Sequence, residues 1–330
     1  MSEAVIVSTA RSPIGRAFKG TLRDERPDDL AAAMVAAALA RIPSFDAADA
    51  GERGLDDLYL GCAEPSGEAG SNMARVVTIL AGLDHVPGAT VNRFCASSLQ
   101  TLRMAFHAIK AGEGHAFVAA GVEAVSRYRD WAGAGETDAS THNPLFDAAR
   151  QRTAARAGSN TPWTDPRLGG RMPDIYIAMG QTAENIATSF GISRADQDAW
   201  AVLSQNRAEA AAASGFYARE ITPYTRKDGT VISRDDSPRA GVTLEAVSAL
   251  QPVFRPEGTV TAGNACPLND GAAAVVVMSD VRARELGLEP LARIVSTGVR
   301  IELVGLNPTR SRTGCPVEIP PAVPPAWLLA

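Results

Sequence analysis

Residues 88–112 place a cysteine where a strand is expected to turn into a helix. Apolar β-forming residues precede Cys95, and a regular apolar pattern follows it. The apolar residues recur at steps of three and four: Leu99, Leu102, Phe106 and Ile109. This spacing predicts a helix with one buried stripe, with Cys95 in its first turn on the same face. Free amide groups and the positive dipole end at a helix start favour a thiolate, so the position suits a nucleophile.

The alternative for Cys95 is a core cysteine without chemistry, because free cysteine is among the most buried residue types. The other cysteines, Cys62, Cys266 and Cys315, are scattered without a C-x-x-C pair, and the chain has 4 histidines. This pattern predicts neither a zinc site nor a disulfide framework. We therefore expect no bound metal.

The composition is that of a water-soluble enzyme. The 330 residues are 45% hydrophobic but only 5% aromatic, and the formal net charge is −5 with no block of like charges. Nucleic acid and anionic membranes are therefore poor partners. No run of about 18 apolar residues predicts a membrane span. The opening MSEAVIVSTARSP lacks the features of a signal peptide, so we expect a cytoplasmic protein.

Alternating strand and helix patterns predict a layered α/β unit. The expected strands are 5–8, 58–62, 90–94, 116–120 and 272–278, and the expected helices are 30–42, 72–80, 97–110 and 281–286.

The stretch from about residue 128 to 253 breaks this rhythm. It is polar, with helices expected at 180–190 and 194–213, a capping pair at Ser193 and Asp196, and a stop at Gly215. An excursion this long needs structure of its own, because long unstructured loops inside compact domains are uncommon.

Six collinear segments resemble the thiolase superfamily. They are VIVSTARSPIGRAFKGTL (5–22), NRFCASSLQ (92–100), AAGVEAVSR (119–127), MGQTAENIA (179–187), SRADQDAWAVLSQNRAEAA (193–211) and GTVTAGNACPLNDGAAAVVVMS (258–279). The resemblance implies a thiolase-like α/β amino-terminal core over residues 1–127 and 254–299. It also implies an inserted loop domain over 128–253 that covers the active site and holds coenzyme A.

The chemistry that the resemblance implies is that of an acetyl-CoA C-acyltransferase or acetyltransferase. Cys95 would cleave a 3-ketoacyl-CoA, as in fatty acid β-oxidation, and pass the acyl group to free CoA, or catalyse the reverse condensation. CoA and acyl-CoA are then substrates, and no cofactor is held permanently. Relatives of this kind imply a homodimer or homotetramer. Arg93 and Phe94 weakly favour the degradative branch, and we expect Glu123 and Asp270 to organise structure and not to carry protons.

Four further residues match CoA-binding positions of the family. By resemblance, Met179 and Phe254 line the pantetheine channel, Arg239 lies near the adenine and phosphate end, and Cys266 stands where many relatives have a serine near the pantetheine. Read alone, Met179 and Phe254 could equally be ordinary core residues, and Arg239 a solvated charge. An apolar tunnel that ends in cations suits this long cofactor.

The resemblance stops after Val299. Residues 300–330 contain six prolines and no apolar period, and the family's second α/β half, with its Gly-His-Pro histidine and Cys-x-Gly cysteine, is absent from the sequence. We expect an irregular, non-family tail, read from a shifted frame or attached to a truncated thiolase, with impaired activity. The alternatives are a genuine shortened paralogue, a non-catalytic CoA-binding or dimerising remnant, and, less favoured by the motifs, a ketoacyl synthase.

Overall fold

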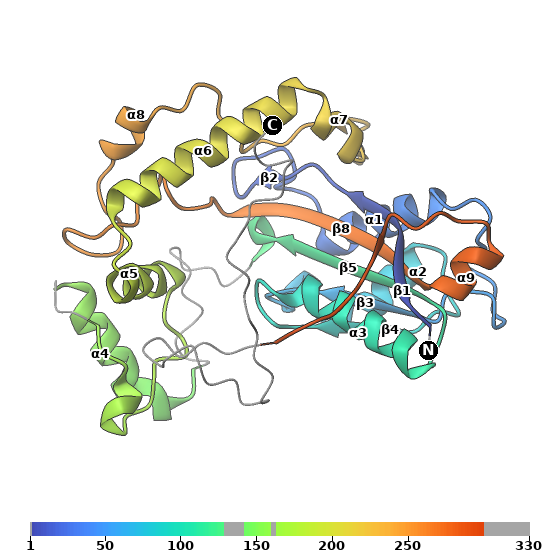
Figure 1. The fold of residues 1–330 in the computed structure, drawn as a ribbon, viewed down its shortest axis with the longest axis horizontal. Coiled ribbons are helices and arrows are strands. Elements are labelled where there is room, and N and C mark those ends of the chain that lie inside the picture. Colours follow the sequence, from blue (N-terminus) through green and yellow to red (C-terminus); the bar gives the residue numbers. More distant parts are fainter. Residues whose placement is uncertain (1, 129–141, 160–162, 300–330) are drawn as a thin grey trace.

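The computed structural model describes residues 2–128, 142–159 and 163–299, and its centre is a mixed β-sheet (Figure 1). Among these residues the sheet has seven strands in the order β4-β3-β5-β8-β1-β9, with β2 paired to β8. The strands are β1 (Ala4–Arg11), β2 (Gly15–Arg16), β3 (Asp57–Gly61), β4 (Gly88–Val91), β5 (Ala116–Ala124), β8 (Asn269–Ser279) and β9 (Ala292–Arg293). β3 is parallel to β4 and β5, whereas β8 is antiparallel to β5 and β1.

The two central strands join segments that are far apart in the sequence. β5 pairs with β8 over its full length, from Ala116 opposite Met278 to Ala124 opposite Asp270. Nearly every residue of β5 is buried, as expected for a strand that is covered on both faces. The sheet therefore needs the segment after the long excursion as much as the segment before it.

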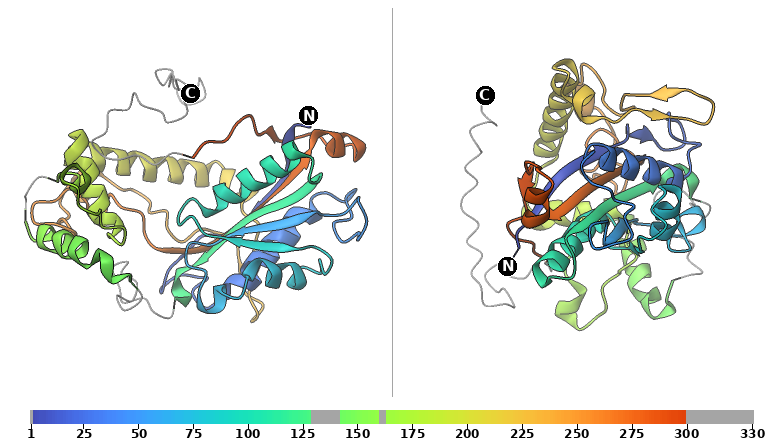
Figure 2. Two further views of the ribbon diagram at one scale, coloured as in Figure 1. Left: turned by 90° about the horizontal axis from the view of Figure 1, so that it is seen from below. Right: turned by 90° about the vertical axis from the view of Figure 1, so that its right-hand side faces the viewer.

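Helices cover both faces of the sheet (Figure 2). On one face, α1 (Pro27–Ala40) and α2 (Met73–Leu80) enclose the larger core cluster, which contains Leu30, Val35, Leu58 and Val276. On the other face, α3 (Ser97–Ala111) encloses a smaller cluster built from Phe106, Ile109, Phe117 and Val277. The α/β layering expected from the sequence is confirmed.

The polar stretch that interrupts the α/β pattern forms one long helix, several shorter helices and a hairpin beside the sheet. The helices are α4 (Asp147–Ala157), α5 (Met179–Phe190), α6 (Arg194–Ala213), α7 (Phe216–Glu220) and α8 (Leu244–Ser248), and β6 (Tyr224–Thr225) pairs with β7 (Val231–Ile232). The short helix α9 (Asp280–Glu285) follows β8. One-turn 3₁₀ helices occur at Gly67–Ala69, Val125–Arg127, Pro144–Phe146 and Pro166–Gly169.

The capping signals around α6 are confirmed. The Ser193 hydroxyl accepts a hydrogen bond from the amide of Asp196 and donates to its carboxylate at 2.7 Å. Gly215 follows the helix with a φ of +75°, a conformation that favours glycine. The strand expected at 90–94 is shorter than predicted, because β4 ends at Val91 and a tight turn follows.

Several sequence expectations remain predictions. The domain limits at 127, 253 and 299 are not tested by the fold, and the tail over 300–330, including Cys315, lies outside the described residues. In the described part of the chain, no helix is long and apolar enough to cross a membrane.

Candidate active site

Cys95 lies in a tight turn between β4 and α3. The helix begins at Ser97 with Ala96 as its N-cap, so Cys95 precedes the helix. The prediction that Cys95 lies in the first turn is therefore wrong, because the chain makes a tight turn before the helix starts. Phe94, the residue before it, has a φ of +46°, in the left-handed region that non-glycine residues rarely adopt. Such strained turns persist only where surrounding contacts hold them. The Cys95 side chain is exposed on this turn.

Hydrogen bonds from Asn92 and Ser97 fix the turn. Asn92 Oδ1 accepts from the Phe94 amide at 2.8 Å, and Asn92 Nδ2 donates to the Ala63 carbonyl at 3.1 Å. The Ser97 hydroxyl donates to the Phe94 carbonyl at 2.6 Å and accepts from the Arg93 amide at 2.8 Å. The backbone on both sides of Cys95 is therefore held by side chains from the same short segment.

The buried face of α3 agrees with the prediction at Phe106 and Ile109 but differs from it near the start of the helix. Leu99 is 66% exposed, and Leu102 is only partly buried. The buried residues nearest the site are Ser97, Thr101 and Ala105. Small residues are needed there because the helix approaches the sheet closely.

Two glycines on the sheet permit this approach. A Cβ atom on Gly61 would lie 2.6 Å from the backbone of Ser97 and Ser98, and a Cβ on Gly121 would lie 1.9 Å from the Ser98 hydroxyl oxygen. Residues Gly61 and Gly121 pair directly between β3 and β5. The start of α3 thus rests on a glycine platform, which sets the position of the Cys95 turn.

Glu123, near the end of β5, binds the residues that follow Gly61 at the end of β3. Its carboxylate accepts hydrogen bonds from the amides of Ala63 at 2.7 Å and Glu64 at 3.3 Å, and from the thiol of Cys62 at 3.4 Å. The Tyr128 hydroxyl donates to the same carboxylate. These bonds agree with the structural role expected for Glu123.

Asp270 is likewise engaged by structural contacts. Its oxygens accept from the Ser126 amide at 2.8 Å and the Ser126 hydroxyl at 2.6 Å, and the Phe18 amide donates to that hydroxyl. Burial raises the pKa of Asp270. The contacts tie β8 to the loop after β2 and to the end of β5.

The three described cysteines differ sharply. Cys62 is buried, and burial together with the nearby Glu123 charge raises the pKa of its thiol to about 12. Cys266 is exposed in the loop before β8. Only Cys95 combines exposure with a fixed turn at a helix start.

Three of the described histidines have contacts away from this turn. His107 Nε2 lies 3.4 Å from Thr297 Oγ1, and His115 Nδ1 lies 2.9 Å from Ser279 Oγ. The His142 ring stacks on Tyr176 with centroids 3.9 Å apart. No described side chain forms a hydrogen bond with the Cys95 thiol.

The structure brings two of the predicted CoA contacts together. Met179 is 70% exposed at the start of α5, next to Gly180. The partly buried ring of Phe254 lies directly over Gly180, where a Cβ atom would come within 2.2 Å of the ring. Gln181 Nε2 donates to the Phe254 carbonyl at 2.6 Å and fixes this arrangement. Met179 is thus exposed beside the glycine that the partly buried Phe254 ring covers, and neither residue belongs to the buried core.

The other two predicted CoA contacts lie at the surface on separate segments. Arg239 is exposed, and its amide donates to Gln205 on α6 at 3.1 Å. Cys266 follows Asn264 in the loop that enters β8.

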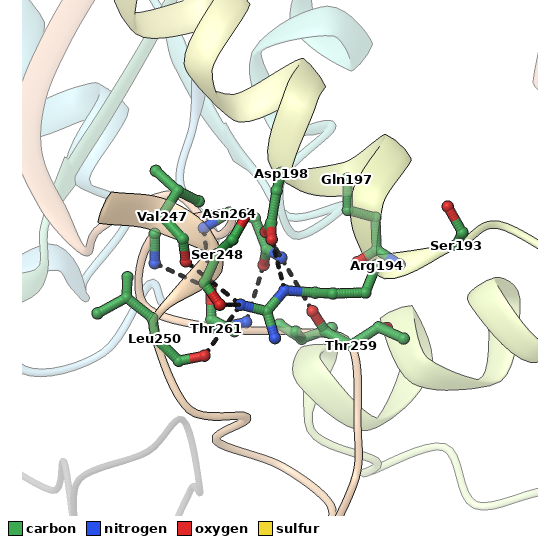
Figure 3. A network of polar contacts seen from close by, with 12 residues as sticks. Ser193, Arg194, Gln197, Asp198, Val247, Ser248, Leu250, Thr259, Thr261 and Asn264 are labelled. Atoms are coloured by element: carbon green, nitrogen blue, oxygen red, sulfur yellow. Dashed lines mark hydrogen bonds and ion pairs between the residues drawn. The ribbon is translucent and has the colours of Figure 1, made fainter. Parts of the chain in front are cut away.

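An ion-pair network, which the sequence analysis missed, anchors these segments to α6 (Figure 3). Asp198, which is 1% exposed, accepts from Arg194 Nε at 2.8 Å and from Asn264 Nδ2 at 2.9 Å. Arg194 Nη2 also donates to the Leu250 carbonyl at 2.9 Å. The network therefore links α6 to the segment that leads to Phe254 and to the loop that carries Cys266. The i, i+4 spacing of Arg194 and Asp198 on the predicted helix was the available signal.

Comparison with known proteins decides the family. The family model "Thiolase, N-terminal domain" matches residues 4–281. The chain belongs to the thiolase family. It is therefore an acyltransferase of the thiolase type by family, and proteins of this family use CoA substrates without a permanent cofactor.

Similar proteins include thiolases that are named for two different substrates. A "Beta-ketoadipyl-CoA thiolase" from Acinetobacter baylyi is 41% identical over 318 residues, which cover 93% of this chain and 75% of the relative. A "3-ketoacyl-CoA thiolase" from Bacillus subtilis is 37% identical, over 94% of this chain and 75% of the relative. The crystal structure of the Bacillus anthracis acetyl-CoA acetyltransferase matches with a TM-score of 0.69 and 33% identity, over 89% of this chain and 70% of that one.

Proposed function

We propose that this protein transfers acyl groups between a 3-oxoacyl-CoA and CoA through a thioester on Cys95. The observation that carries the proposal is the exposed Cys95 on a left-handed turn that Asn92 and Ser97 hold in place. Covalent capture by a thiol divides a difficult carbon–carbon cleavage into two easier steps. A cysteine suits this role because exchange of one thioester for another is nearly balanced.

In the first step, the Cys95 thiol loses its proton and its sulfur attacks the 3-oxo carbon. The bond between C2 and C3 then breaks, and its electron pair remains on C2 as the enolate of acetyl-CoA. The enolate takes up a proton and leaves as acetyl-CoA. The Cys95 amide, at the turn before α3, donates to the oxygen that becomes negative during the attack.

In the second step, the thiol of free CoA loses its proton and attacks the acyl thioester on Cys95. The Cys95 sulfur leaves and recovers a proton, and a shortened acyl-CoA is released. The two steps together consume one 3-oxoacyl-CoA and one CoA, and the reverse direction is the condensation.

The exposed Met179 and the Phe254 ring over the neighbouring Gly180 support a place for the pantetheine arm. We assign Arg239 to the phosphate end of CoA and Cys266 to a position beside the pantetheine. The network of Arg194, Asp198 and Asn264 would keep these segments in register. In the cell, we place the reaction in the cytoplasm, in a homodimer or homotetramer, and in fatty acid degradation or related lipid metabolism.

We also propose that the 330-residue chain turns over slowly by itself. No described side chain forms a hydrogen bond with the Cys95 thiol, so the described residues supply no base at that atom. Loss of one member of a catalytic unit commonly lowers the rate by orders of magnitude. The proline-rich composition of residues 300–330 favours a shifted reading frame for that segment.

The same observation keeps a second function open, that of a non-catalytic CoA-binding or dimerising protein. A thiolysis assay with acetoacetyl-CoA and CoA, together with CoA titration by calorimetry, separates the two. Acyl transfer by the wild-type chain that is lost in Cys95→Ser supports the enzyme. CoA binding without any transfer supports the binding protein, and the absence of both refutes both functions.

A further inference from the structure

Two arginines away from the Cys95 turn share a single hydrogen-bond acceptor. Arg156, near the end of α4, donates from Nη1 to Asn185 Oδ1 at 2.6 Å. Arg255 donates from Nη2 to the same oxygen, also at 2.6 Å. Two positively charged groups therefore lie side by side, an arrangement that like-charge repulsion opposes unless the fold or an anion compensates.

Neighbouring amide groups hold Arg255 in this position. Its Nε donates to Gln181 Oε1 at 2.8 Å, and its Nη2 donates to the Gln181 carbonyl at 3.2 Å. Gln181 and Asn185 are both buried on the same face of α5. The Nη1 atom of Arg255 makes no hydrogen bond with the described residues, so this guanidinium keeps donors for a ligand.

The charges around the pair support an anion site. Burial lowers the pKa of both arginines. For Arg156, burial and the charge of Arg255 together lower the pKa to about 10. Glu184 is the carboxylate whose charge favours the protonated Arg255. Its oxygens already accept from the Thr259 amide at 2.8 Å and the Val260 amide at 2.9 Å. A further anion would relieve the repulsion between the arginines.

We propose that Arg156 and Arg255 bind an anionic group of the acyl-CoA substrate. The group is the carboxylate at the far end of a dicarboxylic acyl chain or a phosphate of CoA. The proposal rests on the proposed function, because Arg255 directly follows Phe254, whose ring lies over Gly180 beside Met179. It agrees with the β-ketoadipyl-CoA named for the Acinetobacter baylyi relative, since an adipyl group carries a free carboxylate.

A pair of matched ligands tests the proposal and distinguishes a carboxylate of the acyl chain from a phosphate of CoA as the bound group. Adipyl-CoA and hexanoyl-CoA have the same chain length and differ only in the terminal carboxylate. Both are titrated by calorimetry into the full chain carrying Cys95→Ser, which blocks exchange of the thioester. If the carboxylate is bound, adipyl-CoA binds about tenfold more tightly, and Arg255→Gln removes this preference. If a phosphate is bound, Arg255→Gln weakens both ligands equally.

The exposed Arg171 provides a matched control, since Arg171→Gln removes a charge from the same part of the chain and should leave both affinities unchanged. An Arg255→Gln variant that binds both ligands as tightly as its parent overturns the proposal. A second experiment uses the unmutated chain, so its result does not depend on whether the Arg255→Gln variant folds.

Butanedione modification of the unmutated chain, mapped by mass spectrometry, probes the same site without CoA. Adipate or inorganic phosphate should slow modification of Arg156 and Arg255 several-fold but not that of Arg171. Protection by these anions in a chain that binds no CoA compound would refute the proposed function while supporting the anion site. Absence of both protection and ligand preference refutes the site.

Discussion

The side-chain oxygen of Asn92 accepts a hydrogen bond at 2.8 Å from the amide of Phe94, the residue with the left-handed backbone. The other end of the Asn92 side chain binds the Ala63 carbonyl, and the Ala63 amide binds the Glu123 carboxylate. A continuous path of hydrogen bonds therefore runs from the end of β5 to the turn at Cys95. The turn that carries Cys95 is therefore positioned by the sheet and not by α3 alone.

Asn92→Ala should loosen this turn. Loss of the two side-chain hydrogen bonds is expected to lower the free energy of unfolding by about 1–3 kcal/mol and to slow alkylation of Cys95 by iodoacetamide. Urea denaturation and adduct mapping measure these effects. Asn143→Ala is the matched control, because Asn143 Oδ1 makes the same kind of contact, with the Leu145 amide at 3.0 Å. If both variants alkylate at the wild-type rate, the turn does not depend on Asn92.

Gly121→Ala should disturb the contact between α3 and β5. The added methyl group meets the Ser98 hydroxyl, so we expect a loss of about 1–3 kcal/mol in stability. Combination with Ser98→Ala should recover part of this loss. Gly61→Ala should not be rescued in this way, because its neighbours are backbone atoms. Gly158→Ala, whose nearest contact is 4.0 Å away, is the control, and an equal effect there would refute the glycine platform.

Asp198→Asn should uncouple α6 from the loop that carries Cys266. Removal of one partner of a buried ion pair costs about 3 kcal/mol in unfolding free energy, whereas Asp196→Asn on the exposed side of the same helix should cost much less. Thermal and urea unfolding measure the difference. Proteolysis should also cut the 249–267 segment faster in Asp198→Asn. Equal stability and equal cleavage for the two variants would contradict the anchoring role.

The stability difference between wild type and Asp270→Asn should depend on pH. Burial raises the pKa of Asp270, so the folded state binds this proton more tightly than the unfolded chain. The contribution favours folding below pH about 4 and is lost as the pH rises through the folded-state pKa. Asp270→Asn should therefore gain stability relative to wild type between pH about 4 and 7. Urea midpoints of wild type and Asp270→Asn across this range measure the effect, and Asn143→Ala, which removes no titrating group, is the reference variant. A stability difference between wild type and Asp270→Asn that does not change with pH would contradict the account.

The sequence predicted the main elements because their signals are local. Ser193, Asp196 and Gly215 mark both ends of α6, and the apolar run of residues 272–278 marks β8. The buried face of α3 was predicted correctly at Phe106 and Ile109 but wrongly at its start, because hydrophobicity alone selected Leu99. The face that packs is chosen by Gly61 and Gly121, which lie elsewhere in the chain and admit only small residues.

The site was predicted in part for the same reason. The position of Cys95 after a strand is a local pattern, whereas the exact helix start depends on the bonds of Asn92 and Ser97. The network of Arg194, Asp198 and Asn264 joins segments more than 60 residues apart in the sequence, since Asp198 and Asn264 are separated by 66 positions. Side-chain pairing over that distance is fixed by tertiary packing, which periodicity does not encode.

The central claim is that Cys95 carries the acyl group, and transfer from labelled acetyl-CoA tests it most directly. This half-reaction breaks no carbon–carbon bond and so isolates the nucleophile. After incubation and proteolysis at mild pH, mass spectrometry should find the acetyl label on the peptide containing Cys95, and excess CoA added before proteolysis should remove it. Cys62 should remain unlabelled, because its buried thiol has a pKa raised to about 12. An unlabelled Cys95, or equal labelling of Cys266 and Cys95, would contradict the account.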